Sequence, residues 1–99
     1  MERELERLKK AQYMERWVGY EEQGIISGIT SFGIFVQLPN TVEGLVRLDT
    51  LIDDYYEFDQ ENYRLVGSNH GRELRLGDSV NVVCTKVDTL IGTIDFRLC

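Results

Sequence analysis

Residues 24–38 restrict the fold most, because two strand-like runs meet at a glycine, Gly33. Successive side chains of a strand point to opposite faces, so the second run has an apolar face and a face that carries Phe35. The apolar face consists of Ile34, Val36 and Leu38. If that face is core, Phe35 points to water, and a bulge at Gly33 would bring Phe32 to the same outer face. Two exposed rings have little structural use, but they suit a protein that stacks bases.

Strand-like alternation recurs along the chain, at about residues 24–31, 33–38, 43–48, 79–88 and 93–98. Residues 49–75 lack a clear period, and a connection this long in a small domain is expected to fold on itself and to be functional. Its four aromatic side chains, predicted to pin it to the barrel, are Tyr55, Tyr56, Phe58 and Tyr63. Five short strands with a long connection between the third and the fourth predict an all-β OB-fold, a five-stranded Greek-key barrel.

A charged, amphipathic helix is predicted over residues 2–17, because apolar side chains recur at three-residue steps and Gly19 is a suitable stop. These side chains are Leu5, Leu8, Ala11 and Met14. We interpret residues 1–20 as a linker helix and residues 21–99 as the barrel domain. The helix is either the end of a longer segment or a cap that packs Trp17 on the barrel, and the two alternatives are compatible.

Composition and charge argue against several classes of protein. The 99 residues suffice for one domain, no apolar run is long enough to cross a membrane, and no signal-peptide pattern is present. Two cysteines and one histidine make neither a disulfide framework nor a zinc site, so a reducing cytoplasm is expected. The net charge of −6 predicts modest affinity for nucleic acid.

The sequence contains no set of side chains typical of catalysis. His70 has no serine or cysteine partner arrangement, and the acidic run of residues 49–61 lacks the spacing of a calcium loop. The chain is therefore predicted not to be an enzyme and to hold no metal or cofactor. After the acidic run come three candidates for phosphate contacts: Arg64, Arg72 and Arg75.

Several segments in order carry a family resemblance: Gly24 to Val36, Glu43-Gly44-Leu45-Val46, Leu76-Gly77-Asp78-Ser79-Val80 and Val87-Asp88. As a set, over about residues 22–97, they resemble the RNA-binding domain first defined in ribosomal protein S1. Three other segments are similar to the C-terminal domain of bacterial ribonuclease R and ribonuclease II-type exoribonucleases: Lys10 to Met14, Asp53 to Asp59 and Asn62 to Gly67.

The resemblance implies a barrel that binds single-stranded RNA without sequence preference and guides it to a catalytic domain outside this chain. That domain would degrade RNA from the 3′ end with magnesium, and the parent protein would also contain cold-shock-type domains. Carried over residue by residue, the RNA-facing side chains are Phe32, Phe35 and Arg47. Arg47 stands where histidine is usual, and arginine still stacks on bases and contacts phosphate.

Two departures from the family pattern weaken its phosphate-facing features. Asp49 stands where a small hydroxyl residue is common, and Leu90-Ile91-Gly92 stands where basic residues are usual. Arg47 has a second interpretation, as a surface arginine paired with Glu43 or Asp49. The alternative function is accordingly a protein-docking barrel, with the ribosome or the parent enzyme as partner and little RNA affinity. In either case the isolated domain is expected to be a monomer without membrane attachment.

Overall fold

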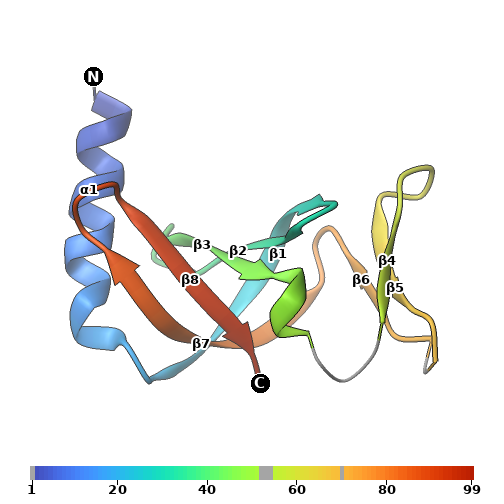
Figure 1. Ribbon diagram of the computed structural model, residues 1–99. Coiled ribbons are helices and arrows are strands. Elements are labelled where there is room, and N and C mark those ends of the chain that lie inside the picture. The colour runs from blue at the N-terminus through green and yellow to red at the C-terminus, as the bar shows by residue number, and fades with distance from the viewer. Residues whose placement is uncertain (1, 52–54, 70) are drawn as a thin grey trace.

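The structure is a computed structural model that describes residues 2–51, 55–69 and 71–99, with side chains from Leu5 onward. One α-helix precedes a closed β-barrel, and a small extra sheet projects on the side of the barrel away from the helix (Figure 1). The helices are α1 (Glu2–Met14) and the short 3₁₀ helices η1 (Glu15–Trp17) and η2 (Leu48–Thr50). The strands are β1 (Glu21–Thr30), β2 (Gly33–Gln37), β3 (Glu43–Arg47), β4 (Tyr56–Asp59), β5 (Arg64–Gly67), β6 (Glu73–Arg75), β7 (Ser79–Asp88) and β8 (Thr93–Leu98).

The barrel strands follow the order β1–β2–β3–β8–β7, and β7 pairs with β1 to close the ring. Neighbouring strands are antiparallel except β3 and β8, which run parallel and pair Leu45 with Asp95. This closed five-stranded barrel confirms the predicted OB-like fold. All five strands predicted from alternation are present.

Alternation along each barrel strand separates a buried face from an exposed one. In β2, Ile34 and Val36 are fully buried while Gln37 is exposed, and β7 buries Val82 in the same way. Burying one such aliphatic side chain contributes about 1.5–3 kcal/mol to folding. The barrel interior is therefore a packed core, and a ligand has to bind on the outer face.

Helix α1 lies along the β7–β8 side of the barrel (Figure 1) and buries Ala11 and Met14 in the shared core. Trp17 packs partly against the same core, whereas Leu5 stays exposed. This packing matches the cap alternative for the helix, and the exact limits of linker helix and barrel domain stay a prediction. In the described ranges, no helix has the length and apolar character needed to cross a membrane.

Phe32 in the β1–β2 hairpin is exposed as predicted, but a bulge at Gly33 is not the cause. The register of β1 shifts at Ser27, so the bulge lies there, and its prediction at Gly33 is wrong. Phe32 belongs to the turn between the strands. Gly33 is needed for another reason. A Cβ atom there would lie 2.3 Å from the backbone oxygen of Val46, so β2 approaches β3 this closely only with glycine.

The described part of residues 49–75 folds on itself as predicted, but the prediction that this segment is irregular is wrong. They contain η2 and an antiparallel sheet of strand order β4–β5–β6. Its strands are only three or four residues long, too short for a clear alternation. Tyr63 at the β4–β5 turn has a φ angle of 53°, a conformation that a non-glycine residue seldom adopts. The sequence pattern did not predict this turn.

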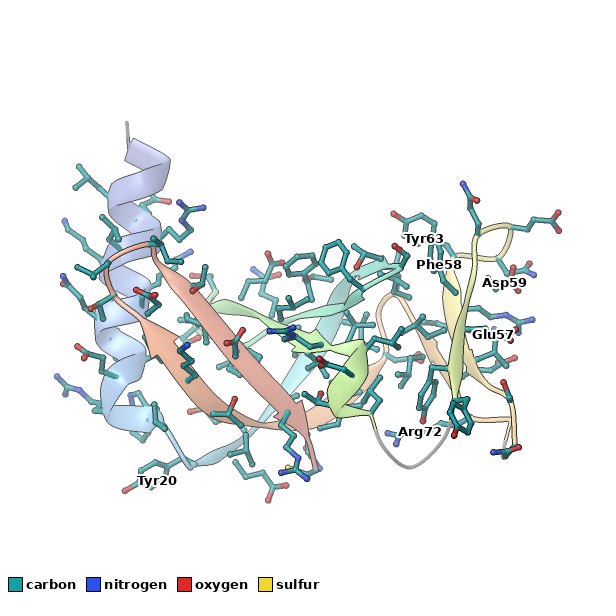
Figure 2. All side chains as sticks on the ribbon, in the orientation of Figure 1. Tyr20, Glu57, Phe58, Asp59, Tyr63 and Arg72 are labelled. Carbon is teal, nitrogen blue, oxygen red and sulfur yellow. The ribbon has the colours of Figure 1, made fainter. Side chains whose placement is uncertain are left out.

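The extra sheet shares one core with the barrel. Tyr56, Leu65 and Leu74 are buried in the same apolar cluster as the barrel strands. Phe58 packs against this cluster and meets Tyr63 edge to face, with ring centroids 6.1 Å apart. Figure 2 shows these two rings on the barrel side of the sheet and Glu57 and Asp59 on its far side. The predicted pinning of this connection by aromatic side chains is confirmed for Tyr56 and Phe58.

Because the core is shared, we expect Leu65→Ala in the extra sheet to destabilise the whole domain. The side chain is fully buried, so truncation should lower the free energy of unfolding by about 2–5 kcal/mol. Urea denaturation followed by the fluorescence of Trp17, the only tryptophan, reports on the helix–barrel contact far from the mutation. Val66→Ala, at a half-buried neighbouring position, is the control and should cost less. A Trp17 midpoint unchanged by Leu65→Ala would show that the sheet unfolds independently.

Candidate nucleic-acid interface

Phe32 and Phe35 form an aromatic pair on the outside of the barrel, which we call the aromatic platform. Their ring centroids are 6.4 Å apart and their planes lie at 89°, an edge-to-face arrangement. The Phe32 side chain is 57% exposed, and Phe35 is half-buried. Both predicted residues therefore lie together on the outer face, with one ring available for a flat partner.

Backbone contacts of the hairpin hold the platform in place. The amide of Leu48 donates to the Phe32 carbonyl oxygen at 2.9 Å, which ties the turn to η2. The Thr30 hydroxyl accepts from the Phe32 amide at 3.3 Å and donates to the Gly33 carbonyl at 2.9 Å. Phe35 pairs with Gly28 in the β1–β2 ladder, and the missing side chain of that glycine leaves room for the ring.

A surface groove of about 570 Å³ runs beside Phe32. Its lining residues are Phe32, Leu45, Arg47, Leu48, Asp49 and Asp95. Arg47 reaches the groove because it lies at the end of β3, directly across the ladder from Gly33. The structure thus brings three predicted RNA-facing residues to one surface: two at the platform and Arg47 beside it.

The Arg47 guanidinium meets Asp49, as one of its two sequence interpretations expects. The nitrogen–oxygen distance is 3.5 Å, and both side chains are largely exposed, at 61% and 69%. An exposed pair at this distance contributes at most about 1 kcal/mol. Breaking this ion pair so that Arg47 can bind a phosphate instead of Asp49 would therefore cost little free energy.

Arg64 lies on β5 of the extra sheet, where two carboxylates hold its guanidinium. Its Nε donates to Asp59 at 3.0 Å, and a terminal nitrogen donates to Glu73. Asp59 also accepts from the Asn62 side chain at 2.9 Å. Hydrogen bonds from Asn62 and Arg64 lower the pKa of Asp59 to about 2, and the bond to Asp59 raises the pKa of Arg64. A phosphate contact by Arg64 would compete with both carboxylates.

Arg72 is exposed and also belongs to the extra sheet region, near its lower end in Figure 2. Arg64 and Arg72 therefore do not lie on the strands next to the platform, β2 and β3, but in the region of the extra sheet. At the β7–β8 turn, where the resemblance implies basic residues, Leu90 and Ile91 are exposed. Asp53, Asp54 and His70 lie outside the described residues.

Sequence reasoning missed Leu45 and Asp95 as groove residues. They become neighbours through the parallel β3–β8 pairing, which joins positions fifty residues apart in the chain. A family pattern of exposed positions would have been the only available signal, since strand alternation does not specify which strands pair. Asp95 adds a second carboxylate beside Asp49, so the lining of the groove holds one cation, Arg47, against two carboxylates.

A family profile described as "S1 RNA binding domain" matches residues 18–98. The chain belongs to the S1 RNA-binding domain family. The S1 domain is 42% identical over 96 residues to ribonuclease R 1 of Lactococcus lactis and 49% identical over 90 residues to ribonuclease R of Aquifex aeolicus. These matches cover 97% and 90% of the chain but 12% and 13% of the relatives, so the chain spans about an eighth of their length.

Solved structures support the same relationship. The S1 domain matches the apo form of Mycoplasma genitalium RNase R with a TM-score of 0.93 and 27% identity, over 99% of this chain and 15% of that one. It matches the same enzyme in complex with ribose methylated single-stranded RNA with a TM-score of 0.92 and 27% identity, over the same shares. The resemblance of this sequence to ribonuclease R is thereby confirmed.

The lowered pKa of Asp59 predicts a pH-dependent contribution to the stability of the S1 domain. Its folded pKa of about 2 lies below the ordinary value of 3.8, so the contribution is present above pH 4 and is lost as the pH falls toward 2. We expect Asp59→Asn to destabilise the domain at neutral pH, by an amount that shrinks between about pH 4 and 2.

Urea unfolding at several pH values measures this difference between wild type and Asp59→Asn. Glu57→Gln is the matched control, because it removes the same charge from the same strand without touching the bonds of Asn62 and Arg64. It separates the loss of these bonds from the general effect of net charge. A destabilisation by Asp59→Asn that does not vary with pH would contradict the prediction.

Proposed function

We propose that this chain binds single-stranded RNA without sequence preference and retains it for the catalytic domain of a ribonuclease R-type 3′–5′ exoribonuclease. The aromatic platform is the observation that carries the proposal. An exposed Phe32 ring beside Phe35 offers a surface for a base, and stacking on it is indifferent to base identity because each base has a π-face. The RNA complex of the Mycoplasma genitalium relative supports the choice of ligand.

In this proposal Arg47 contributes the contact to the RNA backbone. It lies in the same groove as Phe32, and its weak pair with Asp49 is readily exchanged for a phosphate. The net charge of −6 and the acidic Asp49 and Asp95 keep the affinity of the domain modest and dependent on salt. Arg64 and Arg72 stay predicted phosphate contacts of secondary weight, since they lie in the extra sheet region.

In this proposal, another part of the parent protein hydrolyses the RNA. We propose that hydrolysis and its magnesium reside in the catalytic domain, and that this chain acts as a monomeric binding module beside that domain and the cold-shock-type domains in the cytoplasm. Its role would be to raise the local concentration of RNA at the catalytic channel, which increases overall affinity without new catalytic groups.

The second candidate function, docking to a protein such as the ribosome or the parent enzyme, is favoured by one feature. Leu90 is 89% exposed and Ile91 is 57% exposed at the β7–β8 turn, in a place where phosphate contacts would call for cations. Adjacent exposed apolar side chains of this size suit a protein partner better than RNA. This function predicts little binding of RNA even at low salt.

The test is a titration of a fluorescently labelled oligoadenylate of about 12 nucleotides, within the site size of an OB-fold. At low salt we expect binding that weakens as salt rises, and Phe32→Ala should lose about 1–3 kcal/mol of binding free energy. Because the Phe32 ring is mostly exposed, the free energy of unfolding of the Phe32→Ala variant should differ from that of the wild type by no more than about 0.5 kcal/mol.

Tyr20→Ala provides the matched control. Tyr20 is 59% exposed, meets Trp17 edge to face at 5.4 Å, and lies just beyond the end of the helical segment (Figure 2); it does not line the groove beside Phe32. Its removal should leave RNA affinity unchanged. Absence of binding at low salt, or equal losses in the Phe32 and Tyr20 variants, would refute the stacking mechanism and favour the docking function.

A further inference from the structure

A second groove, of about 500 Å³, adjoins the platform on the side of helix α1. It shares Leu45 and Asp95 with the groove beside Phe32, and Phe35 lies in its wall. The two grooves therefore adjoin at Leu45 and Asp95, on β3 and β8, and together they mark out a path over the outer face of the barrel. Along that path the surface changes from the barrel to the helix, because Arg7 and Lys10 of α1 line the far side.

Barrel contacts hold both cations over the groove. Lys10 donates from Nζ to the Thr41 carbonyl oxygen at 3.3 Å, at the β2–β3 turn. Arg7 lies against Gly92 at the β7–β8 turn, so closely that a Cβ atom on that glycine would be 2.9 Å from Arg7 Cγ. Residues three apart share one helix face, so Arg7 and Lys10 point to the same groove.

Arg7 lies next to the β7–β8 turn, which has no cationic side chain in Leu90-Ile91-Gly92. The resemblance implies basic residues at Leu90-Ile91-Gly92, and this chain has none there. Arg7 brings a guanidinium to that turn from another element, and Gly92 leaves it room. Arg7 thus places a cation at the β7–β8 turn, where Leu90, Ile91 and Gly92 carry no charge themselves.

Acidic side chains line the same groove and indicate how a strand of RNA would lie. Glu6, Glu43 and Asp95 are lining residues, and the Glu43 carboxylate accepts a hydrogen bond from the Ser27 hydroxyl at 2.5 Å. Carboxylates repel phosphates but accept hydrogen bonds from the amino groups of bases. Glu43 and Asp95 lie on the strands of the floor and favour bases over Phe35 and Leu45. On the helix wall Glu6 offsets one of the two cations, so that wall keeps one net positive charge for phosphates.

From this geometry we infer that α1 is part of the RNA-binding surface, and that Arg7 and Lys10 bind the phosphates of nucleotides next to those stacked on the platform. The inference rests on the proposed function, since it extends the same RNA path. It gives the helix a binding role in addition to its packing on the barrel.

The experiment compares two double variants of the same helical segment. Arg7→Gln/Lys10→Gln removes both charges from the groove and keeps the part of the Arg7 stem, up to Cγ, that lies against Gly92. Lys9→Gln/Arg16→Gln removes one lysine and one arginine from exposed positions that do not line the groove, so the net charge of the two proteins is the same. Both are titrated with the labelled oligoadenylate over a salt series, and circular dichroism checks that each stays folded.

We expect the groove variant to bind several-fold more weakly at low salt, with a slope of log affinity against log salt reduced by about 1.4, because each single-strand phosphate contact contributes about 0.7. The control variant should keep the wild-type slope. If both variants behave alike while Phe32→Ala still loses affinity, the helix is only a cap and the inference is wrong, although the proposed function stands. If wild type binds no RNA, the proposed function and the inference both fail.

Discussion

The parallel pairing of β3 with β8 is the contact on which the rest of the structure depends. It joins the β1–β2–β3 half of the barrel to β7 and β8, and it does so through a close approach at Gly44, where a Cβ atom would lie 2.7 Å from two ring carbons of Phe96. The Phe96 ring occupies that space and completes the core. On the outside, the same pairing sets Leu45 beside Asp95 and so creates the floor that both grooves share.

Stability and binding use opposite faces of the same strands. In β2, Ile34 and Val36 fill the interior, while Phe35 on the other face contributes to the proposed RNA surface. This separation explains how exposed aromatic rings are tolerated, since each buried neighbour contributes about 1.5–3 kcal/mol that does not depend on them. It also means that binding can change through Phe32 or Arg47 with little effect on folding.

Electrostatics give the surface its character. Arg47 meets Asp49, Arg64 meets Asp59 and Glu73, and the helix groove combines two cations with three carboxylates. For the proposed function, such a surface implies modest affinity, because the nearby carboxylates offset the attraction of each cation for phosphate. The extra sheet adds buried side chains to the core, and its Arg64 is paired with two carboxylates of the same sheet.

The features predicted correctly from the sequence are those that depend on the alternation of side chains within a single strand. Alternation was enough to predict the five barrel strands and the outward direction of Phe35. It failed for the extra sheet, whose strands are too short to show a period, and for the bulge, which lies at Ser27 on the partner strand. Phe32 faces outward as expected, but a turn places it there.

The sequence by itself determined the barrel, its core face and the family, because these depend on local alternation and on motifs read in order along the chain. Only the tertiary structure decided which residues share a groove. Leu45 meets Asp95 through a pairing between distant strands, and Arg7 meets Gly92 through the packing of a helix on a turn. Periodicity assigns a side chain to a face, but the contacts between faces arise only when the whole chain has folded.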